Sequence, residues 1–153
     1  MSSARRAILE AVVTAVKTAT VAGGYNYDLD DDSGTPRVSV GNLFPPLLYP
    51  SVQVLPEGRP SETGPELTGW TRRQSYTLIG WVQGDGTPSG AMYAAADLAD
   101  DIERTLEADR SLGGLVDDVI LSDSYFAGEE IDAGLSDVGG VVTSLTATYR
   151  ERA

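Results

Sequence analysis

Residues 91–126 read AMYAAADLADDIERTLEADRSLGGLVDDVILSDSYF. Apolar residues in its first part recur at steps of three and four, which is the spacing of one helical face: Met92, Ala95, Ala99, Ile102 and Leu106. The opposite face is expected to be solvated and acidic, with Asp97, Asp100, Asp101, Glu103 and Glu107. The stretch therefore predicts an amphipathic helix.

The second part of this stretch predicts a turn and then a strand. Gly113 and Gly114 are expected to end the helix, because glycine readily adopts the left-handed conformation found at helix ends. Val119, Leu121 and Tyr125 then alternate with the residues between them, as in a strand. This junction carries no catalytic group.

The flanking sequence predicts further elements on both sides. An N-terminal helix is expected over residues 3–19, capped by Ser2 or Ser3 and stopped by Gly23-Gly24, with a buried stripe of Ile8, Val12, Val16 and Ala19. Strands are expected over residues 51–56, 70–83 and 141–149, with a short edge strand at 38–40. Thr87 and Pro88 are suited to cap and begin the second helix.

These elements predict an α/β (α+β) fold in the order α-β-β-α-β-β. The chain of 153 residues suits one domain, in which two helices pack on a mixed sheet of four to five strands. The strand–helix–strand step over residues 70–126 favours a right-handed crossover between parallel strands, and the last two strands are expected to pair antiparallel. Residues 57–69 are polar and rich in Pro and Gly, which predicts a long loop that is functional or mobile.

The predicted strand at 70–83 is apolar on both faces. Tyr76, Leu78 and Val82 lie on one face, and Ile79 and Trp81 lie on the other. If both helices cover the first face, the second needs another cover. A neighbouring protomer and residues 25–50 of the same chain are both open as its source.

The charge balance excludes a simple nucleic-acid-binding surface. The chain has 23 acidic and 11 basic residues, a net charge of −12, and Lys17 is its single lysine. Such a surface repels DNA, because binding requires cations that face phosphates. An ordinary acidic protein and adaptation to a halophilic host both explain this composition, and a high-GC genome would also replace Lys by Arg. No apolar run approaches a membrane span.

The sequence favours a protein without catalytic, metal or cofactor residues. It contains no His and no Cys, which excludes Ser-His-Asp and Cys-His catalysis and thiolate or imidazole zinc sites. The run DLDDDSG begins at Asp28 like a calcium loop, but Ser33 and Ser39 occupy the positions that require Gly and Glu. A solvated acidic loop is the favoured interpretation. Gly84–Gly90 has the wrong glycine spacing for a dinucleotide loop, and we interpret it as a turn and helix cap.

Read with its flanks, the chain resembles the tail terminator proteins of long-tailed phages and related tailed viruses, also called tail-completion or tail-to-head joining proteins. The resemblance lies in the order and spacing of RRAILEAVVTAVKTA, YPSVQVLPEG, RRQSYTLIGWVQGDGTPSGAMYAAADLADDIERTL, LGGLVDDVIL and VVTSLTATYRER. It spans nearly the whole chain, and the LGG turn after the acidic helix is its most specific part.

This resemblance implies a structural virion protein, assembled in the host cytoplasm and located in the tail or neck. It implies a homo-oligomeric ring, a hexamer, that caps the tail tube, stops tube polymerisation and joins the tail to the head connector, while DNA passes through without specific binding. We expect subunit or tube contacts at Arg59, Glu62, Glu66, Trp70, Arg72, Arg73, Ile79 and Trp81.

Three alternatives remain open from the residues alone. One is another neck or head-completion protein of similar size. A second is a carboxylate-based metal-binding protein or metal enzyme centred on Asp28, Asp30 and Asp32. A third is a small acidic ligand-binding or adaptor domain. A closed oligomer is required only by the ring hypothesis.

Overall fold

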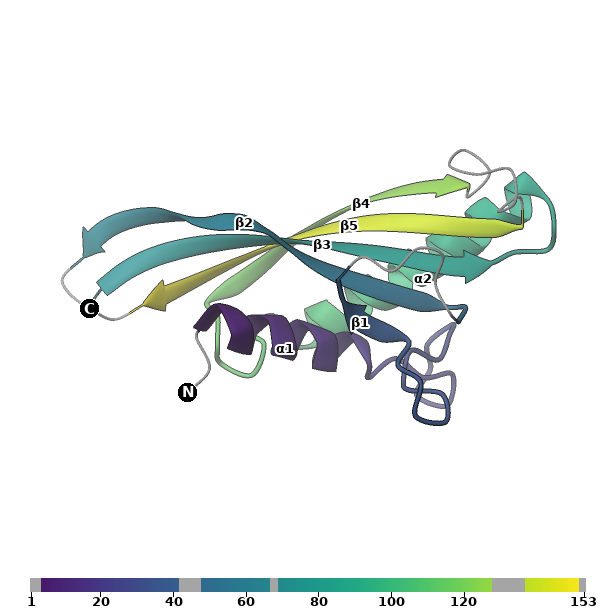
Figure 1. Ribbon diagram of the computed structural model, residues 1–153, viewed down its shortest axis with the longest axis horizontal. Helices are drawn as coiled ribbons and strands as arrows, with labels where there is room; N and C mark the ends of the chain where they lie inside the picture. The colour runs from purple at the N-terminus through teal and green to yellow at the C-terminus, as the bar shows by residue number, and fades with distance from the viewer. Residues whose placement is uncertain (1–3, 42–47, 67–68, 128–136, 152–153) are drawn as a thin grey trace.

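The computed structural model describes residues 4–41, 48–66, 69–127 and 137–151, and it contains two helices and a five-stranded sheet (Figure 1). The elements are α1 (Ala4–Val16), β1 (Val38–Val40), β2 (Ser51–Glu66), β3 (Gly69–Gln83), α2 (Pro88–Ala108), β4 (Asp118–Ala127) and β5 (Val138–Glu151). The predicted fold class is confirmed, and the short edge strand β1 completes the order α-β-β-β-α-β-β.

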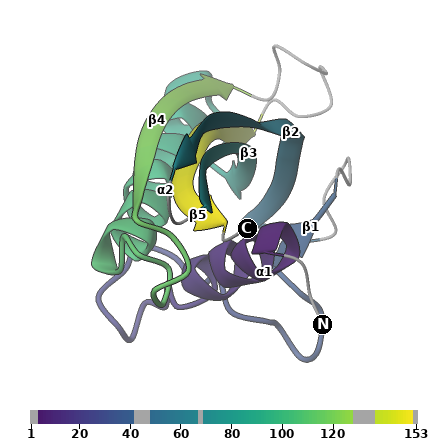
Figure 2. The ribbon, with the colours of Figure 1, turned by 90° about the vertical axis from the view of Figure 1, so that its left-hand side faces the viewer.

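The strands lie in the order β1-β2-β3-β5-β4. Only β1 and β2 pair in parallel, and all other neighbours are antiparallel. The predicted antiparallel pairing of the last two strands is confirmed. The crossover through α2 joins β3 to β4, which run in the same direction but are separated by β5. The sheet is strongly curled when viewed along the long axis of the molecule (Figure 2).

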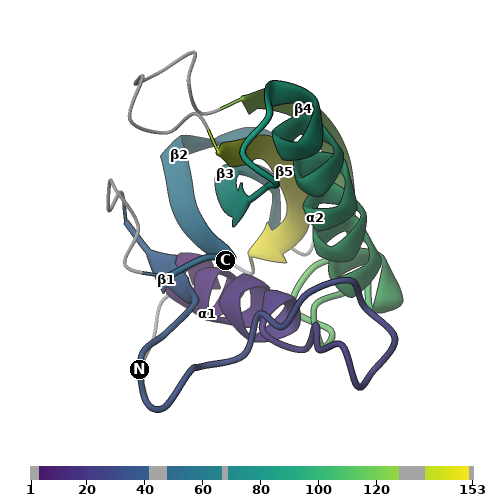
Figure 3. The ribbon, with the colours of Figure 1, turned by 90° about the vertical axis from the view of Figure 1, so that its right-hand side faces the viewer.

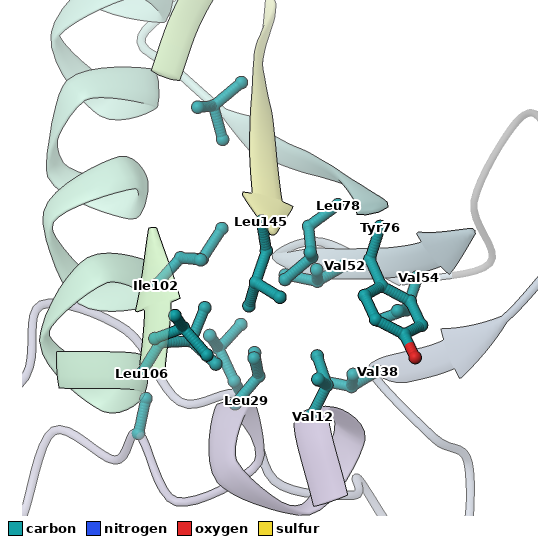
Figure 4. Close-up of a cluster of buried hydrophobic side chains, with 14 of the residues drawn as sticks. Val12, Leu29, Val38, Val52, Val54, Tyr76, Leu78, Ile102, Leu106 and Leu145 are labelled. Atoms are coloured by element: carbon teal, nitrogen blue, oxygen red, sulfur yellow. The ribbon is translucent and has the colours of Figure 1, made fainter. Parts of the chain in front are cut away.

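Both helices pack on the same face of the sheet and share one core (Figure 3). α1 contributes Ile8, Val12 and Val16, which are buried as predicted. Figure 4 shows Val12 of α1 and Ile102 and Leu106 of α2 converging on side chains of β1, β2, β3 and β5. Burial of the aliphatic and aromatic side chains of this core supplies the main favourable free energy of folding.

α2 begins where the sequence predicts it to begin. Thr87 is the N-cap, and its hydroxyl accepts a hydrogen bond from Gly90 N at 3.1 Å. Asp85 accepts from the Thr87 backbone N–H at 3.0 Å. The glycine-rich segment before α2 is therefore a turn and cap, as interpreted from its spacing.

α2 ends five residues earlier than Gly113. Asp109 is its C-cap, and the Asp109 carboxylate accepts hydrogen bonds from Ser111 N at 3.1 Å and from Gly113 N at 2.8 Å. Gly113 and Gly114 do adopt positive φ values of 72° and 87°. They shape the turn into β4 and do not terminate the helix. The helix ends at Asp109, whose side chain accepts hydrogen bonds from the backbone of the turn.

The prediction of a long loop over residues 57–69 is wrong for residues 57–66 and 69, which the structure describes as strand. β2 continues to Glu66 and β3 starts at Gly69, so the two strands form a long hairpin. The pairing shifts register between Glu57 and Ser61 and between Thr63 and Glu66. Pro60 and Pro65 fall inside these two shifts, where a missing backbone N–H is tolerated. The turn signals in the sequence therefore mark bulges.

The far half of this hairpin forms an arm. We define the arm as residues 57–66 of β2, 69–75 of β3 and 146–151 of β5, which pair with one another. β1 pairs only with residues 52–54 of β2, so the arm extends past this edge strand. In Figure 1 the arm projects at one end of the molecule, beyond both helices.

Candidate assembly surfaces

Most of the predicted contact residues lie on the arm. Arg59 lies within the first register shift, Glu62 is opposite Arg72, Glu66 is opposite Gly69, and Trp70 is opposite Glu151. Arg72 is half-buried, whereas Arg73 is exposed and opposite Thr148. The structure thus brings six of the eight predicted residues together on one projection. Their contacts with a neighbouring subunit or tube stay a prediction.

Trp81 is covered within its own chain. Its side chain is 3% exposed, and the Phe126 ring meets it edge-on with the ring centroids 5.3 Å apart. Gly140 of β5 lies between the two rings, because it is opposite Trp81 of β3 on one side and opposite Phe126 of β4 on the other. A Cβ atom at Gly140 would collide with the Phe126 ring, so glycine permits this aromatic contact across β5.

The argument that Trp81 requires cover from a neighbouring protomer therefore does not hold. The T-shaped contact that covers part of the Trp81 ring comes from Phe126 of β4. Ile79 on the same face is half-buried. The sequence does contain the aromatic residue Phe126 that covers Trp81. The strand order and register that bring the two rings together cannot be predicted from the local sequence pattern.

The acidic face of α2 is only partly as predicted. Asp97, Asp100 and Glu107 are exposed, but Asp101 is fully buried. The Asp101 carboxylate accepts hydrogen bonds from Asn26 N at 3.0 Å, Asn26 Nδ2 at 3.1 Å and Tyr27 N at 2.8 Å. Burial raises the pKa of Asp101, and the donors from Asn26 and Tyr27 oppose that rise. Asp101 therefore attaches the segment after α1 to α2.

Glu103 forms a second contact that the solvated-face prediction misses. It is half-buried and faces Asp123 of β4, which is also half-buried. The pKa of Glu103 is raised to about 7, and the largest of the causes is a hydrogen bond with the Asp123 carboxyl group. Burial and the negative charges of Asp123, Glu107 and Asp100 act in the same direction. This pair links α2 to β4 when one of the two carboxyl groups is protonated.

The acidic run after α1 is dispersed among partners from its own chain. Asp28 accepts from Val21 N at 2.8 Å, Asp31 pairs with Lys17 at 3.1 Å, and Asp32 pairs with Arg37 at 3.5 Å. Leu29 in the middle of the run is fully buried. Within residues 4–41, 48–66, 69–127 and 137–151, no group of three or more acidic side chains is arranged to hold a metal ion.

The exposed stripe of α2 carries an aromatic side chain. Tyr93 is 74% exposed and lies four residues before Asp97, and Asp100 follows three residues later. These spacings place the three side chains along one helical stripe. The sequence analysis did not identify Tyr93 as a contact residue. The amphipathic pattern of the helix predicts only that Tyr93 faces solvent.

No helix in the described part of the chain is long and apolar enough to cross a membrane.

Comparison with known proteins gives a similarity in fold. No protein-family model matches the chain, and no curated protein matches it by sequence. Among solved structures, the chain is similar to one from the virion of a native gene transfer agent (GTA) particle. The TM-score is 0.53 with 11% sequence identity, and the match covers 99% of this chain and 100% of that chain. The two chains therefore share a fold over their whole length.

Proposed function

We propose that this protein is a structural virion protein that forms a closed ring, a hexamer, at the end of the tail tube. In this role it stops tube polymerisation and binds the head connector. The observation that carries the proposal is the end-to-end fold similarity to a chain of the GTA virion. The sequence resemblance to tail terminators, which rests on different information, points to the same kind of particle.

The architecture suits assembly without catalysis. The arm projects beyond the helices (Figure 1), where a neighbouring protomer can reach it. The net charge of −12 disfavours phosphate binding, and six copies in a ring multiply that effect. DNA would therefore pass through the channel without adhering to the wall. The ring would act by geometry, with one face on the tube and the other on the connector.

The direct test uses the tail tube protein and the connector protein of the same virion. Adding the purified chain to growing tubes should shorten the tubes, and electron microscopy should show one ring at the end of each tube. Connector should then bind capped tubes and not bare ones. Tubes of unchanged length without terminal rings would contradict the proposal. A ring that binds connector alone would instead indicate another neck or head-completion protein.

A further inference from the structure

We propose that the exposed stripe of α2 formed by Tyr93, Asp97 and Asp100 docks the arm of a second copy of this chain through Arg73. This inference rests on the proposed ring and adds to it the two surfaces that would form each subunit contact. The occupant is a neighbouring protomer, and the contact joins two different surfaces. It is therefore a head-to-tail contact, the kind that closes into rings.

The first observation is the chemistry of the α2 stripe. Tyr93 is 74% exposed, and Asp100 retains a 58% exposed side chain although Arg104 lies 4.0 Å away. Asp97 is exposed and makes no ion pair with any residue in the described ranges. A tyrosine ring flanked by carboxylates fits an arginine, whose planar guanidinium stacks on aromatic rings and pairs with carboxylates.

The chain already contains one such arrangement. The Arg104 guanidinium lies over the Tyr25 ring with its carbon 4.5 Å from the ring centroid, and Asp100 is beside it. The same side chain donates to the Gly24 carbonyl at 3.2 Å. An arginine, a tyrosine and an aspartate thus meet on the solvent side of α2 within one protomer. The Tyr93 end of the stripe offers the same groups without the arginine.

The second observation is the segregation of charge. The arm contains four arginines and four acidic residues, so it is formally neutral. The whole net charge of −12 is then carried by the remainder of the chain. α2 alone contains five acidic residues and one arginine. The arm with exposed Arg73 therefore meets an acidic helix with less repulsion than the acidic remainder of the chain would on average.

The third observation is position. The arm lies at one end of the long axis, and α2 begins near the other end, after β3 (Figure 1). One protomer cannot bring its own arm onto its own Tyr93. Two copies placed end to end can, and repetition of that contact gives either a closed ring or an open filament. Tyrosine and arginine are also the residue types most enriched in the centres of interfaces.

The test uses charge reversals on each surface and measures oligomer mass across a concentration series. Arg73→Glu and Asp97→Arg should each raise the concentration needed for ring formation at least about tenfold, which is typical of central contacts. Tyr93→Ala should weaken the ring similarly. The combined variant Arg73→Glu/Asp97→Arg should recover most of the loss, because it restores an opposite pair. Arg73→Lys should weaken the ring less than Arg73→Glu.

Asp30→Arg is the matched control, because it makes the same charge change on an exposed carboxylate elsewhere. It should leave ring formation unchanged or improve it slightly. Circular dichroism and thermal melting of each dilute variant would confirm that the monomer stays folded. A mixture of Arg73→Glu with Asp97→Arg subunits provides an independent readout. In an alternating ring of the two variants, each contact joins either two unchanged surfaces or two reversed surfaces, and both combinations have opposite charges. The mixture should therefore form mixed rings at concentrations where neither variant forms a ring alone.

The outcomes separate the docking contact from the ring itself. If the wild type forms rings that Arg73→Glu, Asp97→Arg and Tyr93→Ala leave as stable as before, the docking contact is wrong and the proposed function stands. The docking contact is also wrong if the three variants form stable rings that no longer bind tubes. The stripe would then bind the tube and not a neighbouring protomer. A wild-type chain that stays monomeric at every concentration, alone and with tubes, refutes both.

Discussion

At the scale of single residues, Asp101 shows how a binary pattern misplaces a charge. Its spacing within α2 is that of the acidic, solvated face, yet it is buried and accepts three hydrogen bonds from Asn26 and Tyr27. The partners lie about 75 residues away in sequence. A helical period describes only which way a side chain points from its own helix, so it contains no information about a loop that covers it.

We expect Asp101→Ala to lower the free energy of unfolding by about 1–3 kcal/mol, because it leaves the partly buried backbone N–H groups of Asn26 and Tyr27 without their acceptor. The measurement is urea unfolding of the monomeric protein. Glu107→Ala on the exposed side of the same helix is the control, and its effect should stay within about 0.5 kcal/mol. Equal losses for the two variants would show that Asp101 is not a structural anchor.

At the scale of elements, periodicity predicted the helices and most strands correctly. The buried stripe of α1 and the alternation in β3 and β5 depend on local spacing, and the structure confirms them. The arm was missed because Pro and Gly in residues 57–66 are ordinarily turn signals. They are compatible with β2 here because they fall in bulges at an edge that β1 leaves unpaired.

The contact surfaces were predicted less well than the fold. Arg72 and Arg73 stand out locally as a basic pair at the start of a strand. Strand order has no local signal, so the insertion of β5 between β3 and β4 and the meeting of Trp81 with Phe126 were not predictable. The Glu103–Asp123 contact between α2 and β4 depends on the same crossover.

The Glu103–Asp123 contact predicts how stability changes with pH. Because the folded protein raises the pKa of Glu103 from 4.5 to about 7, the fold favours the protonated form. The stabilisation is fully present below about pH 4.5 and is lost as the pH rises through about 7. Glu103→Gln cannot ionise, so it should remove this part of the pH dependence and make the protein more stable than the wild type at pH 8.

The measurement is the urea midpoint of both proteins between pH 5 and pH 8, with Glu10→Gln at an exposed position of α1 as the control. Other groups titrate in both proteins, so the informative quantity is the difference between the two curves. That difference should grow in favour of Glu103→Gln as the pH rises. Parallel curves would mean that the two carboxyl groups do not interact in solution.

At the scale of the whole molecule, the net charge of −12 governs association. Like charges repel within one protomer and more strongly between protomers in a ring. Salt shortens the reach of that repulsion from roughly 10 Å at 0.1 M to roughly 3 Å at 1 M. The Arg73 contact proposed above is also screened, but it is one pair set against many like charges.

We therefore expect ring stability to increase with salt, more than the stability of the monomer does. Sodium and potassium chloride should act alike, because screening does not depend on a specific cation site. Light scattering and thermal melting across a series from 0.05 M to 2 M test this expectation. A ring that is equally stable throughout would argue against adaptation to a halophilic host and would leave ring formation itself untouched.

The central claim is that this chain closes on itself into a ring. The most direct measurement is the oligomeric mass of the purified full chain by light scattering in 2 M potassium chloride, with class averages of the same sample from electron microscopy. A hexameric ring gives a mass of six protomers and closed particles with six-fold symmetry. Monomers or two-fold dimers at every concentration, with no closed particles, would contradict it.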